Sequence, residues 1–406
     1  MEIQTSLPKH SPPPPIEQTV VSKLVAERTK HLVPLILTRI HAGYFRITLS
    51  LGWQALLWKI LLQPTQDSKI AIRAPKVFYS TILTIIWSFS LVILILLSLL
   101  YSLKCIFRFS MIKAEFMHHV GVNYLFAPWI SWLLILESAP FVTPKHVSFV
   151  ILWWIFAIPV IILDVKIYGQ WFTKGKRFLT AVANPASQLS VVGNLVGARA
   201  AAKMEWREVS VFLFSLGMVH YLVLFVTLYQ RLSGGDRLPA MLRPVFFLFF
   251  AAPSVASLAW YSISGSFDTP SKMLFFLSLF LFASLICRPA LFRKAMRRFN
   301  IAWWAYSYPI TLLALASARY EQEVQGGVSR AIRLLLSGLS VLVLLGLLLL
   351  TAFNPKLLLP DNDPILLTTA LCFQLSFSHR TPMLTMWSNE GPFPKRIKRV
   401  GQKGKS

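Results

Sequence analysis

Acidic residues are scarce in this sequence. Its 406 residues include 16 aspartates and glutamates against 41 lysines and arginines, which gives a formal net charge of +25. Charged residues of both signs make up only 14% of the chain, while hydrophobic residues make up 55%. A soluble protein of this length does not hide so large an apolar fraction, so the composition predicts an integral membrane protein.

Cysteine is also rare. Cys105, Cys287 and Cys372 are odd in number and lack the spacing of a metal site, so we expect neither a disulfide framework nor a bound metal. Residues 1–37 contain no apolar segment of the kind found in a signal peptide, and we interpret them as a short disordered cytosolic tail. The sequence has no metalloprotease motif and no nucleophile–base pair, so we expect no enzyme and no cofactor.

Long apolar runs dominate what the sequence does contain. Several reach the roughly 20 residues that a helix needs to cross a bilayer. We predict ten spans, over residues 41–62, 77–103, 120–138, 147–165, 180–200, 209–230, 244–264, 272–287, 299–318 and 334–353.

Prolines divide these spans into two kinds. Pro128, Pro185, Pro253 and Pro309 each lie within an apolar run, and these runs alternate with runs that are mostly unbroken. A membrane helix tolerates an internal proline only where protein or a water-filled cavity satisfies the freed backbone groups. We therefore expect the proline-bearing helices inside the protein and the unbroken helices outside it.

This alternation predicts an all-α integral membrane fold with ten transmembrane helices, arranged as five parallel helical hairpins around a central pore. The first hairpin lacks the proline, and Gly43 and Gly52 are expected to bend it instead. The channel domain would cover residues 38–354. A basic tail, expected to be disordered and cytosolic, would follow over residues 355–406.

Basic residues gather in the connections on the side of both chain termini. Such a bias predicts that both termini are cytoplasmic, and its interleaving with apolar spans argues against nucleic-acid binding. Lys113, Arg177 and Arg288 would lie at the cytosolic mouths of the pore, although the same topological bias explains each of them equally well.

Acidic groups are nearly absent where a cation path would need them. Glu137 and Asp164 lie near span ends, and no acidic residue lies in the middle of a predicted inner helix. Cation pathways normally use carboxylates or focused carbonyls. Because helix N-termini at the breaks would add positive dipole ends, the pattern favours an anion.

A polar stripe marks the fifth predicted span. Ser187, Gln188 and Asn194 lie within a few turns of Pro185. Hydrogen bonding between helices explains any one of them about as well, but a whole stripe on a proline-broken helix favours a wet path.

Two further intramembrane groups are isolated in the sequence. We interpret His220 as a hydrogen-bonded packing residue rather than as part of a proton relay. Asp164 and Lys166 are expected to pair with each other near a helix end.

Several segments closely resemble the plant slow (S-type) anion channel family, part of the wider tellurite-resistance/dicarboxylate transporter superfamily. The resemblance covers about residues 38–354, and the short N-terminal tail is most like that of the short-tailed homologues. The matching segments are HAGYFRITLSLGWQALLWK, GVNYLFAPWISWLL, KIYGQWF, KRFLTAVANPASQLSVVGNLVGA, GMVHYLVLFVTLYQRL, FFLFFAAPSVASLAW and FNIAWWAYSYPITLLAL.

The resemblance implies a gate within the pore. In the family a phenylalanine just before the proline of the ninth helix plugs the pore, and Tyr308 stands at that position here. Leu134 corresponds to a second aromatic residue that contacts the plug. The family's basic mouth residues correspond to Lys113, Arg177 and Arg288. The hydroxyl of Tyr308 could hold the ring shut by hydrogen bonding, or it could hydrate the constriction.

The resemblance also implies substrates and partners. We expect a plasma-membrane channel for chloride and nitrate, assembled as a homotrimer or as a mixed trimer with a long-tailed homologue, with a regulatory kinase as a further partner. Two alternatives stay open: an electrically silent modulatory subunit, and a proton-coupled dicarboxylate (malate) carrier that would use His220 and Asp164.

Overall fold

The computed structural model is helical throughout the part of the chain that it describes, without a strand there, and this confirms the all-α class. The predicted tails cover residues 1–37 and 355–406, and all of their residues except 36 and 37 lie outside that part. The described residues are 36–62, 76–118, 120–174, 183–233, 240–293, 295–297 and 299–354.

Five helices form a closed ring. Each of these inner helices packs against the next, and the last packs against the first. In ring order they are α2 (Arg46–Leu61), α6 (Phe126–Ser138), α9 (Gln188–Lys203), α11 (Leu248–Ser264) and α13 (Trp304–Val324).

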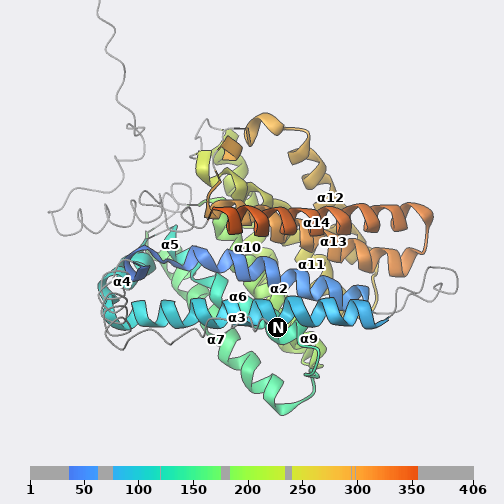
Figure 1. The fold of residues 1–406 in the computed structure, drawn as a ribbon, viewed down its shortest axis with the longest axis horizontal. Coiled ribbons are helices and arrows are strands. Elements are labelled where there is room, and N and C mark those ends of the chain that lie inside the picture. Colours follow the sequence, from blue (N-terminus) through green and yellow to red (C-terminus); the bar gives the residue numbers. More distant parts are fainter. Residues whose placement is uncertain are drawn as a thin grey trace, which may run out of the picture.

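Five further helices form an outer layer. Each packs against the inner helix that precedes it in the chain, as Figure 1 shows for α2 with its neighbour α3 and for α13 with its neighbour α14. The outer helices are α3 (Lys76–Phe107), α7 (Val147–Lys174), α10 (Arg207–Ser233), α12 (Thr269–Ile286) and α14 (Gly327–Phe353).

Six of the described helices are long and apolar enough to cross a membrane: the five outer helices and α11 with the turn before it. A seventh span follows if α4 (Phe109–Met117) and the strongly bent segment Gly121–Ser138 count as one. The outer helices have only a minority of their residues buried, whereas α11 is mostly buried. Helices α2, α9 and α13 fall short of the membrane criterion because they are short or polar, and the surrounding helices bury them.

The inner helices share a distinctive beginning. Short 3₁₀ segments lead directly into α2, α9, α11 and α13. In three of the four, the residue just before the 3₁₀ segment has an extended backbone. Its side chain accepts a hydrogen bond from the backbone N–H two residues later. These caps are His41 to Gly43, Asn184 to Ala186, and Asn300 to Ala302.

The four prolines lie close to these beginnings. Pro128, Pro253 and Pro309 fall within the first two turns of α6, α11 and α13, and Pro185 opens the 3₁₀ segment before α9. The expectation that Pro185 breaks a helix is therefore wrong. A proline fits in the first turn of a helix because its missing N–H would have no intrahelical partner there, as at Pro128 and Pro185. Pro253 and Pro309 lie one turn further in, inside their helices, where each removes one intrahelical hydrogen bond.

The inner helices run parallel. Ser50 Oγ of α2 donates to the Trp304 carbonyl at the start of α13 at 3.2 Å, and Gln54, one turn later, accepts from Thr311 further along α13. Near the other end of α2, Lys59 Nζ donates to the Glu137 carbonyl at the end of α6. The N-terminal ends of the inner helices therefore lie together at one end of the ring.

The closest approach between α2 and α6 supplies a test of this packing. A Cβ atom at Gly52 would lie 3.1 Å from Leu134 Cβ, whereas one at the exposed Gly338 of α14 would meet nothing within 4 Å. We expect Gly52→Val to lower the melting temperature of the detergent-purified protein, because overpacking costs about 1–3 kcal/mol. Gly338→Val carries the same change in helix propensity and is the control; equal losses in the two variants would contradict the tight α2–α6 contact.

Candidate functional site

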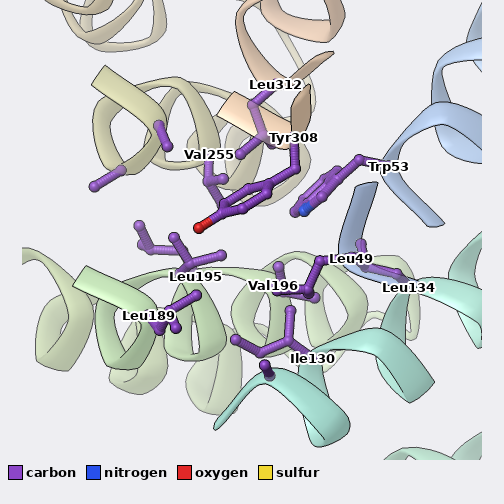
Figure 2. Close-up of a cluster of buried hydrophobic side chains, with 14 of the residues drawn as sticks. Leu49, Trp53, Ile130, Leu134, Leu189, Leu195, Val196, Val255, Tyr308 and Leu312 are labelled. Atoms are coloured by element: carbon purple, nitrogen blue, oxygen red, sulfur yellow. The ribbon is translucent and has the colours of Figure 1, made fainter. Parts of the chain in front are cut away.

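An apolar cluster fills the centre of the inner ring around Tyr308. Figure 2 shows the Tyr308 ring beside Trp53, with Val255 and Leu195 nearer its hydroxyl. The Tyr308 side chain is 1% exposed. The cluster draws on all five inner helices, through Leu49, Trp53, Ile130, Leu134, Leu189, Leu195, Val196, Val255, Tyr308 and Leu312.

The hydroxyl of Tyr308 makes no hydrogen bond to any residue of the described ranges. The described residues therefore supply no hydrogen-bond partner by which the Tyr308 hydroxyl would hold the ring shut. Packing of the aromatic ring against its apolar neighbours keeps it in place. Leu134 belongs to the same cluster, where it packs against Gly52 on the α2 side.

Several buried N–H donors of the inner helix ring have no hydrogen-bond acceptor in the described chain. Arg46 of α2 is 1% exposed, and its Nε, Nη1 and Nη2 atoms have no hydrogen-bond acceptor in the described chain. The same holds for Trp53 Nε1, Gln54 Nε2 and Trp304 Nε1. Buried N–H groups without acceptors favour a negatively charged or oxygen-bearing guest.

The predicted polar stripe divides between two surroundings. Gln188 is fully buried, and neither of its amide atoms has a partner in the described chain; Ser187 is buried next to it in the 3₁₀ turn. Asn194 instead donates through Nδ2 to Asp164 Oδ2 of the outer helix α7 at 2.7 Å. The expectation that Asn194 lines a wet path is therefore wrong, because its amide serves the hydrogen bonding between helices.

Asp164 anchors a buried network behind the ring. Ser190 Oγ donates to Asp164 Oδ1 at 2.7 Å and also lies 2.8 Å from His220 Nδ1. The expected pairing of Asp164 with Lys166 is wrong: Lys166 donates to the Phe116 carbonyl and lies over the Phe116 ring. Residues two apart in a helix project from different faces, so the two side chains do not meet.

A second charged cluster lies at the C-terminal ends of α6 and α9. The buried Glu137 carboxylate is 3.2 Å from Arg199 Nη1 and 3.6 Å from Lys203 Nζ. Lys59 Nζ donates to the Glu137 carbonyl at 2.9 Å. Three cations thus lie around Glu137, two at its carboxylate and one at its backbone carbonyl, and the cluster carries an excess of positive charge. Sequence reasoning missed it because its members come from three separate helices and share no local spacing.

The predicted basic mouth residues lie outside the ring. Lys113 on α4 and Arg288 after α12 are exposed, and Arg177 lies outside the described residues. Both described residues belong to connections that lead into the N-terminal ends of inner helices. They can raise the local concentration of anions there, but the groups inside the ring are Arg46 and Gln188.

The described ranges hold no group of three or more His, Cys, Asp or Glu side chains arranged to bind a metal ion. The ring instead combines parallel helix N-termini, a buried guanidinium and unpaired N–H donors at one end with surplus cations at the other. Each of these features attracts negative charge. Chemically, the ring is suited to small anions.

Comparisons with known proteins agree with this assessment. The profile of the voltage-dependent anion channel family matches residues 39–352. The S-type anion channel SLAH1 of Arabidopsis thaliana is 58% identical over 330 residues, which covers 81% of this chain and 85% of that protein. SLAH4, another S-type anion channel of that plant, is 57% identical over 80% of this chain and 86% of its own length. The guard cell S-type anion channel SLAC1 is 43% identical over 82% of this chain and 59% of its own length.

The Glu137 cluster predicts a large loss of stability when its only carboxylate is neutralised. Glu137→Gln leaves Arg199 buried without a counter-charge, and breaking a buried ion pair costs about 3–5 kcal/mol. We expect a clear fall in melting temperature, which is measured by tryptophan fluorescence in detergent at a fixed salt concentration. Glu205→Gln removes the exposed Glu205–Lys145 pair and should change little. A Glu137→Gln protein as stable as this control would show that the cluster does not stabilise the fold.

Proposed function

Because the chain belongs to the voltage-dependent anion channel family, we propose that it is a slow-type anion channel subunit that passes chloride and nitrate down their electrochemical gradients. The multi-pass helical membrane fold and the relatives named as S-type anion channels support this proposal. The observation that carries it is the buried Tyr308 ring among the five inner helices, whose unpaired polar groups in the described chain are mostly N–H donors.

Ten membrane-crossing helices, paired as five hairpins around a pore, are part of this proposal. The ring of contacts among the inner helices supports it, as does the packing of one outer helix on each. In this arrangement the short and polar α2 and α9 cross the membrane inside a protein sheath. The pore follows the axis of the inner ring, and Tyr308 blocks it near the middle.

The proposed mechanism uses the shape of the plug and the sign of the charge around it. Anions gather at the basic mouths near Lys113, Arg177 and Arg288, and they lose part of their hydration in the narrow apolar ring. Ser187 and Gln188 at the start of α9 would partly replace the lost water. Conduction requires the Tyr308 ring to move out of the apolar cluster. Leu134 contributes to the packing of that cluster around the closed ring.

The proposed setting is the plasma membrane, with both termini cytoplasmic. The predicted assembly is a homotrimer, or a mixed trimer with a long-tailed homologue, and a kinase is the proposed regulator. The likeness to SLAH1 and SLAH4 over most of their lengths supports this setting.

A second candidate function is an electrically silent, modulatory subunit. The observation that favours it is the burial of Tyr308, which is 1% exposed among apolar side chains, since moving a buried ring costs its packing contacts. Expression alone and together with a long-tailed homologue separates the two functions: a self-sufficient channel conducts alone, whereas a silent subunit only alters the partner's current.

Removal of the plug is expected to open the pore. In Tyr308→Ala, we predict anion currents at least tenfold above those of the wild type, measured by voltage clamp in chloride and nitrate baths with surface expression checked. Tyr306→Ala removes a half-buried tyrosine from the same helix, where it packs on Phe247 and Phe292, and should leave the pore closed. Silent membranes with Tyr308→Ala at the surface would sink the gate assignment.

Replacement of the hydroxyl alone is expected to matter little. Tyr308→Phe keeps the ring, and the lost hydroxyl has no hydrogen-bond partner among the described residues. We predict currents within about twofold of the wild type, since a factor of two corresponds to only about 0.4 kcal/mol of gate stability. A large current in Tyr308→Phe would mean that a hydrogen bond, and not packing, holds the gate.

A further inference from the structure

Arg46 carries a buried positive charge that no described protein group neutralises. The side chain is 1% exposed, and the guanidinium lies over the Tyr124 ring, with Cζ 4.5 Å from the ring centroid. An aromatic face offers no oxygen or nitrogen acceptor, so the N–H groups of Nε, Nη1 and Nη2 stay unpaired. No acidic residue of the described ranges forms an ion pair with Arg46.

The acidic residue near this region, Glu115, interacts with other groups. Glu115 accepts a hydrogen bond from the Ala42 backbone N–H at 2.9 Å, lies 3.8 Å from Lys104 Nζ, and accepts from the Tyr101 hydroxyl. Its charge is therefore matched by Lys104. Arg46 is left as the surplus cation at this end of the ring.

A glycine lets the guanidinium lie close to the backbone. A Cβ atom at Gly43 would lie 2.9 Å from Arg46 Nη2 and closer still to the His41 ring. The Arg46 and His41 side chains thus occupy the place that a side chain at position 43 would fill. Any larger residue there would displace the guanidinium.

The position of Arg46 relative to the plug suggests what the guest is. Arg46 and Trp53 are seven residues apart and so lie on one face of α2, separated by roughly 10 Å along the helix. Trp53 lies beside the Tyr308 ring (Figure 2). Arg46 is thus on the side of the plug where the inner helices begin and their dipoles are positive.

We propose that Arg46 forms a binding subsite for a single small inorganic anion, next to the plug on the N-terminal side of the ring. A buried cation without a counter-charge is strongly unfavourable, and an anion held there would offset that cost. The subsite rests on the proposed function, since it lies in the path that the channel would use. The subsite would hold an anion next to the closed gate.

The chemistry of the guanidinium predicts a preference for anion shape. Its planar fork donates two parallel N–H bonds to a planar oxyanion such as nitrate, whereas a lysine ammonium is a point charge. Arg46→Lys should therefore retain more of the binding of a spherical halide than of nitrate. Arg46→Gln should abolish the binding of both.

Binding is tested on the purified wild-type protein with sodium nitrate and sodium bromide as probes, against gluconate at the same ionic strength. A ligand that binds only the folded protein raises the melting temperature, and the rise grows with the logarithm of the ratio of ligand concentration to dissociation constant. We expect nitrate and bromide to raise it in the wild type and in Arg293→Gln, which removes an exposed arginine from the same end of the protein. Arg46→Gln should show no rise with either anion.

Equal stabilisation of the wild type and Arg46→Gln by nitrate would overturn the proposal, and so would its absence from the wild type. If Arg46→Gln does not fold, Arg46→Lys decides the question. A selective loss of nitrate stabilisation supports the subsite, and an unchanged response to both anions refutes it.

Currents in the Tyr308→Ala background separate this proposal from the channel function. With the gate open, Arg46→Gln should raise the nitrate concentration for half-maximal current at least fivefold, while Arg293→Gln should not. If no variant conducts but nitrate still protects only proteins with Arg46, the channel function fails and the subsite stands. If Tyr308→Ala conducts and Arg46→Gln changes neither current nor protection, the channel function stands and the subsite fails.

Discussion

Hydrocarbon offers no partner to a polar group, and this constraint underlies the whole structure. A path for ions needs polar groups and helix ends inside the membrane, so these must be surrounded by protein. The two layers meet that need: the ring of α2, α6, α9, α11 and α13 holds the polar groups and the prolines, and the outer helices present apolar side chains outward. The Asp164 network shows the same constraint locally, since donors from α9 satisfy a carboxylate on α7.

Positive charge is distributed so that both ends of the ring attract anions. At the N-terminal end the parallel helix dipoles and Arg46 act in the same direction. At the C-terminal end the dipoles are negative, and the surplus of Lys59, Arg199 and Lys203 over Glu137 reverses the sign. A ring with one attractive end would trap anions, whereas two attractive ends separated by an apolar plug suit passage in either direction.

The plug itself depends on packing alone. Tyr308 is held by apolar side chains from all five inner helices and by no hydrogen bond within the described chain. Contacts of this kind are individually weak and are lost together when the ring swings away. In the proposed channel, the gate would therefore be sensitive to small shifts of any inner helix.

The sequence by itself determined the helical membrane class, because hydropathy is a local signal. The proposed plug, Tyr308, was indicated only by the family resemblance. Proline placement separated inner from outer helices only in part, since the outer helix α7 contains Pro159 and the inner helix α2 contains no proline. The sequence could not determine side-chain partners. Asn194 pairs with Asp164 across 30 residues, and the Glu137 cluster joins three helices. Only the tertiary structure decided that Lys166 turns away from Asp164 and that Arg46 has no acidic partner among the described residues. The physical reason is that pairing in a bundle depends on which helix faces meet, and the rotation of each helix is decided by packing across the whole ring.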